Sequence, residues 1–253
     1  MLDKSLEKAF WNHVNRDPLN YYFFISDMKL RPDQTKIWLA MEDQKIEGLL
    51  LVYRDYIVQL RGSREAVRLL LNQVTLEKVD LQAPLGYDDI VLDRYRPKVK
   101  EEIVLMHLSK GEEKTQISTA PERLSVEDAE EISQIMKNED PVWWGDLTAE
   151  RLKSALSDAC WLGIRQDQRI ASAGMTRIVD FGSNISVVVT RKEYRNRGYA
   201  TSIVSALVQE ILKASSTALI HVLSDNASAI RTYSKVGFRP YKSYLSIHIE
   251  KAY

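Results

Sequence analysis

Between residues 195 and 200 the chain reads Arg195-Asn196-Arg197-Gly198-Tyr199-Ala200. The preceding residues 185–190 read Ile-Ser-Val-Val-Val-Thr, a run rich in β-branched side chains that predicts a buried strand. The following apolar residues recur at helical spacing as far as Leu212. The sequence therefore predicts a strand, a short basic turn with one glycine, and then a helix.

This predicted turn has the chemistry of an anion site. The first N–H groups of a helix lack acceptors within the helix and carry a partial positive charge. A turn of small residues lets an anion approach those N–H groups closely, and arginines add ionic attraction. We expect the turn to suit a pyrophosphate group.

Composition limits the class of protein. With 253 residues, 45% hydrophobic and 28% charged, the chain has the length and balance of one or two ordinary globular domains. The formal net charge is zero, which disfavours a general nucleic-acid binder. The single cysteine, Cys160, excludes an internal disulfide, and the four histidines show no metal-ligand spacing. We therefore predict no metal site.

The sequence also indicates a compartment. No apolar run approaches the roughly 18 residues that a membrane span needs. The charged, amphipathic residues 1–8 do not read as a signal peptide. We expect a cytoplasmic protein with no membrane partner.

Hydrophobic periodicity divides the chain into two blocks of similar order. In the second block it predicts helices over 125–136 and 148–156, strands over 161–165, 170–180 and 185–190, a helix over 198–212, a strand over 218–223, a helix over 227–235 and a strand over 244–250. In the first block it predicts a helix over 3–15, a buried segment over 21–25, strands over 36–42, 48–53 and 56–61, a helix over 64–72, a strand over 79–82, a short helix within 86–95 and a strand over 102–108.

Both blocks thus read ααβββαβαβ, which suggests two tandem copies of one α/β architecture. The alternative is an unrelated α+β domain at the N-terminus. The polar segment around residues 113–120 is interpreted as a linker between domains at 1–112 and 121–253.

Two motifs in the second block carry a family resemblance. The first is Arg195-x-x-Gly198-x-Ala200, and the second is Asn226-x-x-Ala229-x-x-x-Tyr233-x-x-x-Gly237-Phe238. Because both motifs occur, and occur in this order, residues 121–250 resemble the GNAT superfamily of acyl-CoA-dependent N-acyltransferases. Residues 189–201 are most similar to its glycine N-acyltransferase-like branch.

The resemblance implies a mixed α/β sheet that is splayed near its centre, with the acyl-CoA arm in the split. Backbone groups of one strand would pair with the pantetheine arm, and backbone N–H groups of the turn would hold the pyrophosphate. Asn226 would bind the pantetheine arm or brace its own turn, and the Tyr233 hydroxyl would give a proton to the leaving thiolate. The implied cofactor-binding residues are Val188, Val189, Thr190, Arg195, Asn196, Arg197, Gly198, Tyr199, Ala200 and Asn226.

By the same resemblance the chain is an N-acetyltransferase. A primary amine on a small molecule or peptide would attack acetyl-CoA directly in a ternary complex, which needs no enzyme nucleophile. The predicted strand 184–190 carries no acidic residue that could serve as the base. The candidates are Asp180, Glu193 and a water chain through Ser186, of which we favour the water chain. The sequence does not decide between a monomer and a homodimer.

Other interpretations stand beside this one. Tyr233 could be a packed core aromatic, and the adjacent Trp143 and Trp144 could line the acceptor pocket or pack between domains. The first block carries Leu60-Arg-Gly-Ser-Arg-Glu-Ala66 without the motif's spacing, so we interpret it as a degenerate copy. The alternative function is a non-catalytic acyl-CoA-binding or interaction module.

Overall fold

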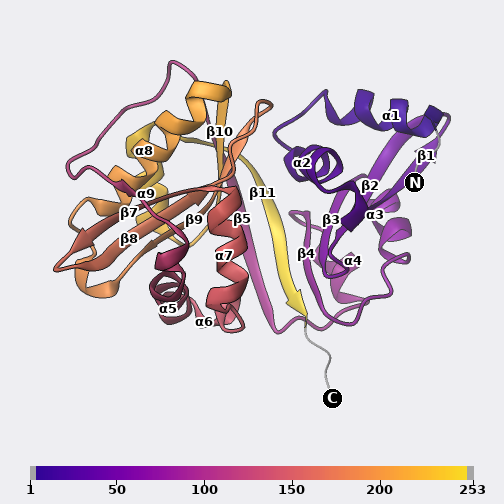
Figure 1. Cartoon of the computed structure of the whole chain (residues 1–253). Coiled ribbons are helices and arrows are strands. Elements are labelled where there is room, and N and C mark those ends of the chain that lie inside the picture. The colour runs from indigo at the N-terminus through magenta and orange to yellow at the C-terminus, as the bar shows by residue number, and fades with distance from the viewer. Residues whose placement is uncertain (1–3, 250–253) are drawn as a thin grey trace. The chain divides into compact units, whose positions relative to one another are not determined.

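The computed structural model describes residues 4–249, drawn in Figure 1 from indigo to yellow along the chain. These residues form two compact units. Unit 1 comprises residues 4–104, 223–225 and 242–249, and unit 2 comprises residues 105–222 and 226–241. In the described range no helix is both long enough and apolar enough to cross a lipid bilayer.

Unit 1 is built on a sheet with helices formed from the N-terminal part of the chain. Its elements are α1 (Lys4–Val14), α2 (Tyr22–Leu30), the 3-10 turn η1 (Pro32–Gln34), β1 (Thr35–Glu42), β2 (Lys45–Tyr53), β3 (Ile57–Gly62), α3 (Arg64–Leu71), β4 (Val79–Pro84) and α4 (Asp88–Leu92). Strands β1, β2 and β3 pair antiparallel, and β3 pairs parallel with β4. The other edge of β4 pairs antiparallel with the C-terminal part of β11 (Arg239–Ile249).

The core of unit 1 follows from the apolar faces of these elements. Side chains of β2, β3, α3 and β4 form one buried cluster, to which Leu245 and Ile247 of β11 also belong. Two of its hairpins turn on residue pairs with positive φ, Asp43-Gln44 and Arg54-Asp55. Such left-handed pairs match the right-handed twist of the strands they join.

Unit 2 contains the motif-bearing part of the chain. Its elements are the C-terminal part of β5 (Val99–Ser109), then β6 (Glu122–Arg123), η2 (Val126–Asp128), α5 (Ala129–Glu139), α6 (Pro141–Trp144), α7 (Ala149–Asp158), β7 (Cys160–Gln166), β8 (Arg169–Thr176), β9 (Ser183–Thr190), η3 (Lys192–Tyr194), α8 (Tyr199–Ala214), β10 (Thr217–Leu223) and α9 (Ala227–Val236). Strands β6 to β9 pair antiparallel in sequence order, and β9 pairs parallel with β10.

Helices cover both faces of the sheet in unit 2 (Figure 1). Helix α8 packs on one face, where a Cβ at Gly174 would lie 2.5 Å from the Ile203 side chain. The neighbouring Ala173 points to the opposite face, into the apolar cluster formed with α5 and α7. The missing side chain at Gly174 therefore lets α8 approach the centre of the sheet.

The sheet of unit 2 splits between β9 and β10. The parallel register joins Ser183, Asn184 and Ile185 of β9 to β10 and ends at Ile185. Strand β9 nevertheless stays paired with β8 as far as Thr190, after a register shift that leaves Ser186 as a bulged residue. From Ser186 onward, one edge of β9 thus has no strand partner among the described residues.

The observed elements follow the predicted order. Among the differences, strand β8 ends at Thr176 although the periodicity continued to residue 180, and Asp140-Pro141 opens the short helix α6, which was not predicted. Proline is favoured in the first turn of a helix, and the Asp140 carboxylate accepts a hydrogen bond from the Trp143 N–H at 3.1 Å. The residues that stop one helix therefore start another.

The two units that the contacts define do not follow the predicted domain boundary between residues 112 and 121. The segment predicted as a linker lies on unit 2, where the N–H of Lys114 donates to Val236 at 2.8 Å and the N–H of Ser118 donates to Ser202 Oγ at 3.1 Å. Residues 242–249 of β11 belong to unit 1 although they end the second sequence block. The interpretation of the units as an active and a degenerate copy stays a prediction.

Asp27 of α2 makes the stability of the protein depend on pH. It is buried beside Arg31, with an Oδ1–Nη1 distance of 3.3 Å, and burial raises the pKa of its carboxyl to about 6. Between about pH 4 and pH 6 the folded state keeps a proton that the unfolded chain has lost, so the free energy of unfolding falls as pH rises through this window. Asp27→Asn removes this titrating group. When the pH is lowered from about 7.5 to 4.5, the free energy of unfolding measured with urea should rise by about 1–3 kcal/mol more in the wild type than in the variant.

The matched control for this measurement is Asp33→Asn, which changes an exposed carboxyl in the neighbouring turn. Because the Asp33 side chain is exposed, this variant controls for the loss of one carboxylate without the loss of a buried group. A pH-independent difference for Asp27→Asn would contradict the raised pKa.

Candidate functional site

The turn between β9 and α8 leaves backbone N–H groups without an acceptor. Asn196 and Gly198 have φ values of +62° and +82°, and α8 begins at Tyr199. The first N–H of this helix with a backbone acceptor is that of Ser202, which donates to Gly198 at 3.0 Å. In the described part of the chain, no group accepts from the N–H groups of residues 196–201. They remain available to an anion.

Gly198 is required by conformation as well as by space. Its left-handed φ strains most side chains, and a Cβ there would lie 3.3 Å from Ser118 Oγ. Gly198 itself is exposed, so an anion can reach the turn. The sequence argument named only the obstruction of a phosphate, and the structure adds the backbone constraint.

Residues 188–190 lie on the unpaired edge of β9 and are half-buried. Two carbonyl groups of this stretch are already used: that of Val189 accepts from Ser172 Oγ at 3.0 Å, and that of Thr190 accepts from Arg195 Nε at 3.3 Å. Along the chain, this edge is followed by η3 and then by the turn of residues 195–200. An extended ligand on this edge would place one end at the N–H groups of residues 196–201.

The two arginines of the turn contact the protein. The Arg195 guanidinium forms an ion pair with Glu139, at the end of α5, and the same carboxylate accepts from the Lys192 N–H at 3.1 Å. The Arg197 guanidinium lies 5.3 Å from the centre of the Tyr194 ring. Arg195 thus braces the turn, a role that the sequence analysis did not anticipate. Only the tertiary fold brings Glu139, 56 residues away, to this position.

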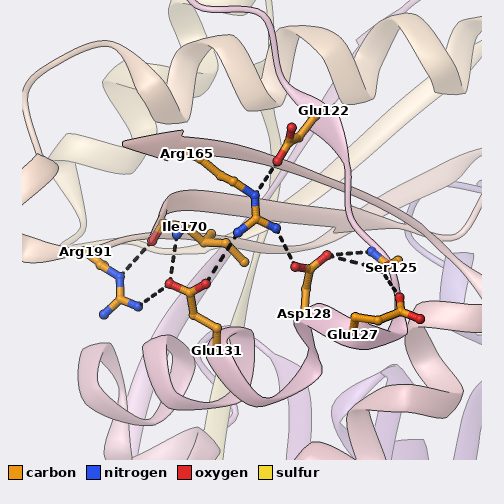
Figure 2. Close-up of polar contacts among 8 residues, drawn as sticks. All are labelled: Glu122, Ser125, Glu127, Asp128, Glu131, Arg165, Ile170 and Arg191. Carbon is orange, nitrogen blue, oxygen red and sulfur yellow. Dashed lines mark hydrogen bonds and ion pairs between the residues drawn. The ribbon is translucent and has the colours of Figure 1, made fainter. Parts of the chain in front are cut away.

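An ion pair between the buried Arg191 and the half-buried Glu131 fixes the end of β9 just before the turn (Figure 2). Arg191 donates from Nε to the Ile170 carbonyl at 2.7 Å and pairs through Nη2 with Glu131 Oε1 at 2.9 Å. The same Oε1 accepts from the Ile170 N–H at 2.8 Å. One carboxylate on α5 therefore ties together β8 and the residue that follows β9.

The rest of this cluster attaches the start of α5 to β7 (Figure 2). Arg165 pairs with Asp128 and with Glu122, each at 2.5 Å. Asp128 also accepts from the Ser125 N–H at 2.8 Å, as one half of a capping box. These contacts hold the helix on which Glu131 and Glu139 lie.

Tyr233 lies on α9, a helix that packs against α8. It is 7% exposed, and its ring meets Phe238 edge-on with 6.2 Å between ring centres. Burial raises the pKa of Tyr233 to about 12, and no described residue forms a hydrogen bond with its hydroxyl. The hydroxyl thus holds its proton at neutral pH and can donate it to a ligand.

Asn226 is the N-cap of α9. Its Oδ1 accepts from the Ala229 N–H at 3.0 Å, and the side chain is exposed. Of the two roles that the resemblance implied, the structure shows the bracing contact. Gly237 ends the same helix with φ +115°, the expected left-handed position.

The three candidates for a base differ in their surroundings. Asp180 lies exposed in the turn before β9, and Glu193 lies exposed in η3, where its carbonyl accepts from Arg197 at 3.4 Å. Ser186 is exposed at the bulge of β9, where the sheet splits. Ser186 is therefore the candidate located at the opening of the sheet.

Behind Ser186 runs a polar chain that the sequence analysis missed. Asn184 Nδ2 donates to Ser186 Oγ at 3.1 Å, and Asn184 Oδ1 lies 3.0 Å from His221 Nδ1. Because this amide oxygen can only accept, the hydrogen in this contact lies on His221 Nδ1. Nothing in the linear order of the sequence pairs His221 with residue 184.

Trp143 and Trp144 are both half-buried. Trp144 packs against the apolar cluster between the sheet and helices α5 and α7. The predicted lining of an acceptor pocket by these tryptophans stays a prediction.

Cys160 is buried, and burial raises the pKa of its thiol.

Comparison with known proteins bears on the fold of the chain. The family model described as FR47-like protein matches residues 161–247. Comparison of the sequence with curated proteins gives no match. The evidence for the fold therefore comes mainly from solved structures.

Three solved structures are similar to nearly the whole chain. A putative acetyltransferase of the GNAT family from Novosphingobium aromaticivorans is 19% identical, with 81% of this chain and 89% of that chain covered and a TM-score of 0.60. A Drosophila protein is 13% identical, with 98% and 97% covered and a TM-score of 0.74. A tandem GNAT protein from the clavulanic acid biosynthesis pathway, solved without acetyl-CoA, is 12% identical, with 93% and 88% covered and a TM-score of 0.52.

At these identities the likeness establishes the fold. The chain has a GNAT fold, the mixed α/β fold that the sequence predicted, and that prediction is confirmed. The assignment to the glycine N-acyltransferase-like branch stays a prediction.

Removing Glu131 should destabilise the fold strongly. Glu131→Ala leaves Arg191 buried without its carboxylate and the Ile170 N–H without its acceptor, which typically costs about 3–5 kcal/mol. Glu131→Gln keeps a neutral acceptor and should cost less, about 1–3 kcal/mol. Urea unfolding measures both, with the exposed Glu130→Ala on the same helix as control. Equal stability of Glu131→Ala and Glu130→Ala would contradict the anchoring role.

Proposed function

We propose that this chain is an acyl-CoA-dependent N-acyltransferase that transfers an acetyl group from acetyl-CoA to a primary amine. The observation that carries the proposal is the continuity between the unpaired edge of β9 and the N–H groups of residues 196–201. A pantetheine arm has amides that can pair with a strand edge, and a pyrophosphate suits the N-terminus of a helix. The GNAT fold supports the same assignment.

Each element of the site has a part in binding. The edge from Val188 to Thr190 would pair with the pantetheine arm, and the turn from Arg195 to Ala200 would hold the pyrophosphate. Arg195 acts through Glu139 to keep the turn in place, and Arg197 adds positive charge on the surface of the turn. The donor set requires no metal, and among the described residues no group of three His, Cys, Asp or Glu side chains gathers as a metal site.

Tyr233 would act as the general acid. Its pKa of about 12 keeps the hydroxyl protonated over the range in which amines are acetylated. A proton held on a buried hydroxyl without a protein acceptor can pass to the departing thiolate sulfur. Asn226 supports this role indirectly, because it caps the helix that carries Tyr233.

The amine must lose a proton before it attacks the thioester. Ser186, at the split of the sheet, would hold a water that receives this proton, in keeping with the preference drawn from the sequence. Asn184 orients the Ser186 hydroxyl and contacts His221 Nδ1 through its other amide atom. A water chain at the exposed Ser186 hydroxyl would carry the proton from the amine to bulk solvent, since no carboxylate on β9 accepts it.

The alternative is a module that binds acyl-CoA without catalysis. It is favoured by one specific observation, the absence of an acidic side chain on β9 within residues 183–190. Acetyl-CoA affinity without turnover across a broad panel of amines would select this alternative.

The first test concerns the turn. Gly198→Asn adds a side chain where the pyrophosphate would lie, while asparagine tolerates the left-handed backbone. Calorimetry should show that affinity for acetyl-CoA falls by about a hundredfold or more, the scale of losing charge-assisted hydrogen bonds. Gly111→Asn is the control, because Gly111 has φ +94° with open space around it. Normal affinity in Gly198→Asn would refute the assignment of this turn.

The second test concerns Tyr233. Tyr233→Phe should lower kcat by about 10²- to 10⁴-fold, the usual contribution of a general acid, while acetyl-CoA binding is kept. Tyr241→Phe, at an exposed tyrosine, should leave kcat unchanged. Steady-state kinetics and calorimetry on the same preparations separate the two effects. Unchanged turnover in Tyr233→Phe would remove this residue from the mechanism.

A further inference from the structure

Unit 1 contains a buried cation that the proposed reaction does not use. Arg61, near the end of β3, is 4% exposed. Its guanidinium donates to the carbonyl groups of Leu60 at 2.8 Å and Asn20 at 3.4 Å, and to the side-chain oxygen of Gln59 at 3.1 Å. Gln82 accepts from the same group. All of these acceptors are neutral.

The charge of Arg61 is therefore not neutralised by a contacting carboxylate among the described residues. The guanidinium lies over the ring of Tyr244, 3.9 Å from the ring centre, and Asp17 attracts it only from a longer distance. Burial lowers the pKa of Arg61 below its usual value. A buried charge of this kind is costly unless an opposite charge approaches it.

A cavity of about 400 Å³ lies beside this cation, entirely within unit 1. Its described lining holds two cations, Arg61 and Lys242, and no acidic side chain. Tyr21, Tyr87 and Leu85 contribute aromatic and apolar surface to the same lining. The volume lies in the range of small-molecule sites, which combine apolar walls with a few polar groups.

The cavity does not have the features of a pyrophosphate site. Ser63 Oγ caps α3 by accepting from the Ala66 N–H at 3.3 Å, and the Ser63 N–H donates to Glu47 at 3.0 Å. The Tyr87 hydroxyl donates to the Gly62 carbonyl at 3.2 Å. The turn that corresponds to residues 195–200 is therefore closed by its own contacts.

We propose that this cavity binds a small organic carboxylate. The carboxylate group faces Arg61 and Lys242, and the apolar body of the ligand lies among Tyr21, Tyr87 and Leu85. The ligand supplies the negative charge that the fold leaves out, and a charge-assisted contact of this kind is among the stronger ones available. This site is separate from the acyl-CoA site and does not depend on it.

The test uses benzoate as the probe and the full chain without acyl-CoA. Calorimetry should show saturable binding of benzoate, and thermal unfolding should show stabilisation by mass action. Benzamide, which has the same shape without the charge, and acetate, which lacks the aromatic body, should both bind at least about tenfold more weakly. Benzamide binding as tightly as benzoate would overturn the role of the two cations.

Two variants locate the site. Lys242→Glu changes an exposed side chain, so the fold should survive, and it should weaken benzoate binding by about tenfold or more because it adds a negative charge to the lining. Lys45→Glu, an exposed lysine outside the lining, should have no effect. Arg61→Gln should weaken binding by about ten- to a hundredfold if it folds, as circular dichroism will show.

The remaining outcomes also decide the proposal. Equal loss in Lys242→Glu and Lys45→Glu would show a nonspecific charge effect and overturn it. Binding of inorganic phosphate that exceeds binding of benzoate would overturn the choice of an apolar carboxylate. Because no acyl-CoA is present, none of these results depends on the proposed acetyltransferase activity.

Discussion

The candidate site depends on the way one strand is held after it loses a neighbour. Strand β9 parts from β10 at Ile185 and continues for five residues with only β8 beside it. An unpaired strand edge is free to fray or to pair with other chains unless its end is fixed. Here the pair between Arg191 and Glu131 fixes it, and Glu131 also accepts from the backbone of β8. The split between β9 and β10 and the turn after β9 are therefore held in a fixed arrangement.

This anchoring explains why the acidic side chains that support the turn lie on helix α5 and not on the turn itself. Helix α5 carries Glu131 and Glu139, which hold the end of β9 and the guanidinium of Arg195, respectively. The backbone N–H groups of residues 196–201 are thus left to an anion while the side chains support the turn. A charge that braces the backbone adds less direct attraction to a ligand, but it reduces the conformational entropy that binding must otherwise remove.

The two units differ at the glycine turn between a strand and the following helix. In unit 2 the turn carries N–H groups without acceptors and an exposed, left-handed Gly198. In unit 1 the N–H of Ser63 donates to Glu47, and a Cβ at Gly62 would lie 2.3 Å from the Glu47 carbonyl. A buried arginine and a cavity lie beside that closed turn. The two proposed anion sites therefore differ in chemistry, one using backbone N–H groups and the other using cationic side chains.

The sequence by itself determined the order of the elements, the glycine turn before α8 and the cap and terminating glycine of α9, because these depend on local periodicity and on residues a few positions apart. It also indicated that Tyr233 lies on the helix after β10. Only the tertiary structure decided that Arg195 contacts Glu139, that His221 follows Ser186 in a polar chain, and that Arg61 lies buried without a contacting carboxylate. Those contacts join residues that are far apart in the chain, or depend on where a strand leaves its partner, and hydrophobic periodicity contains no information about either.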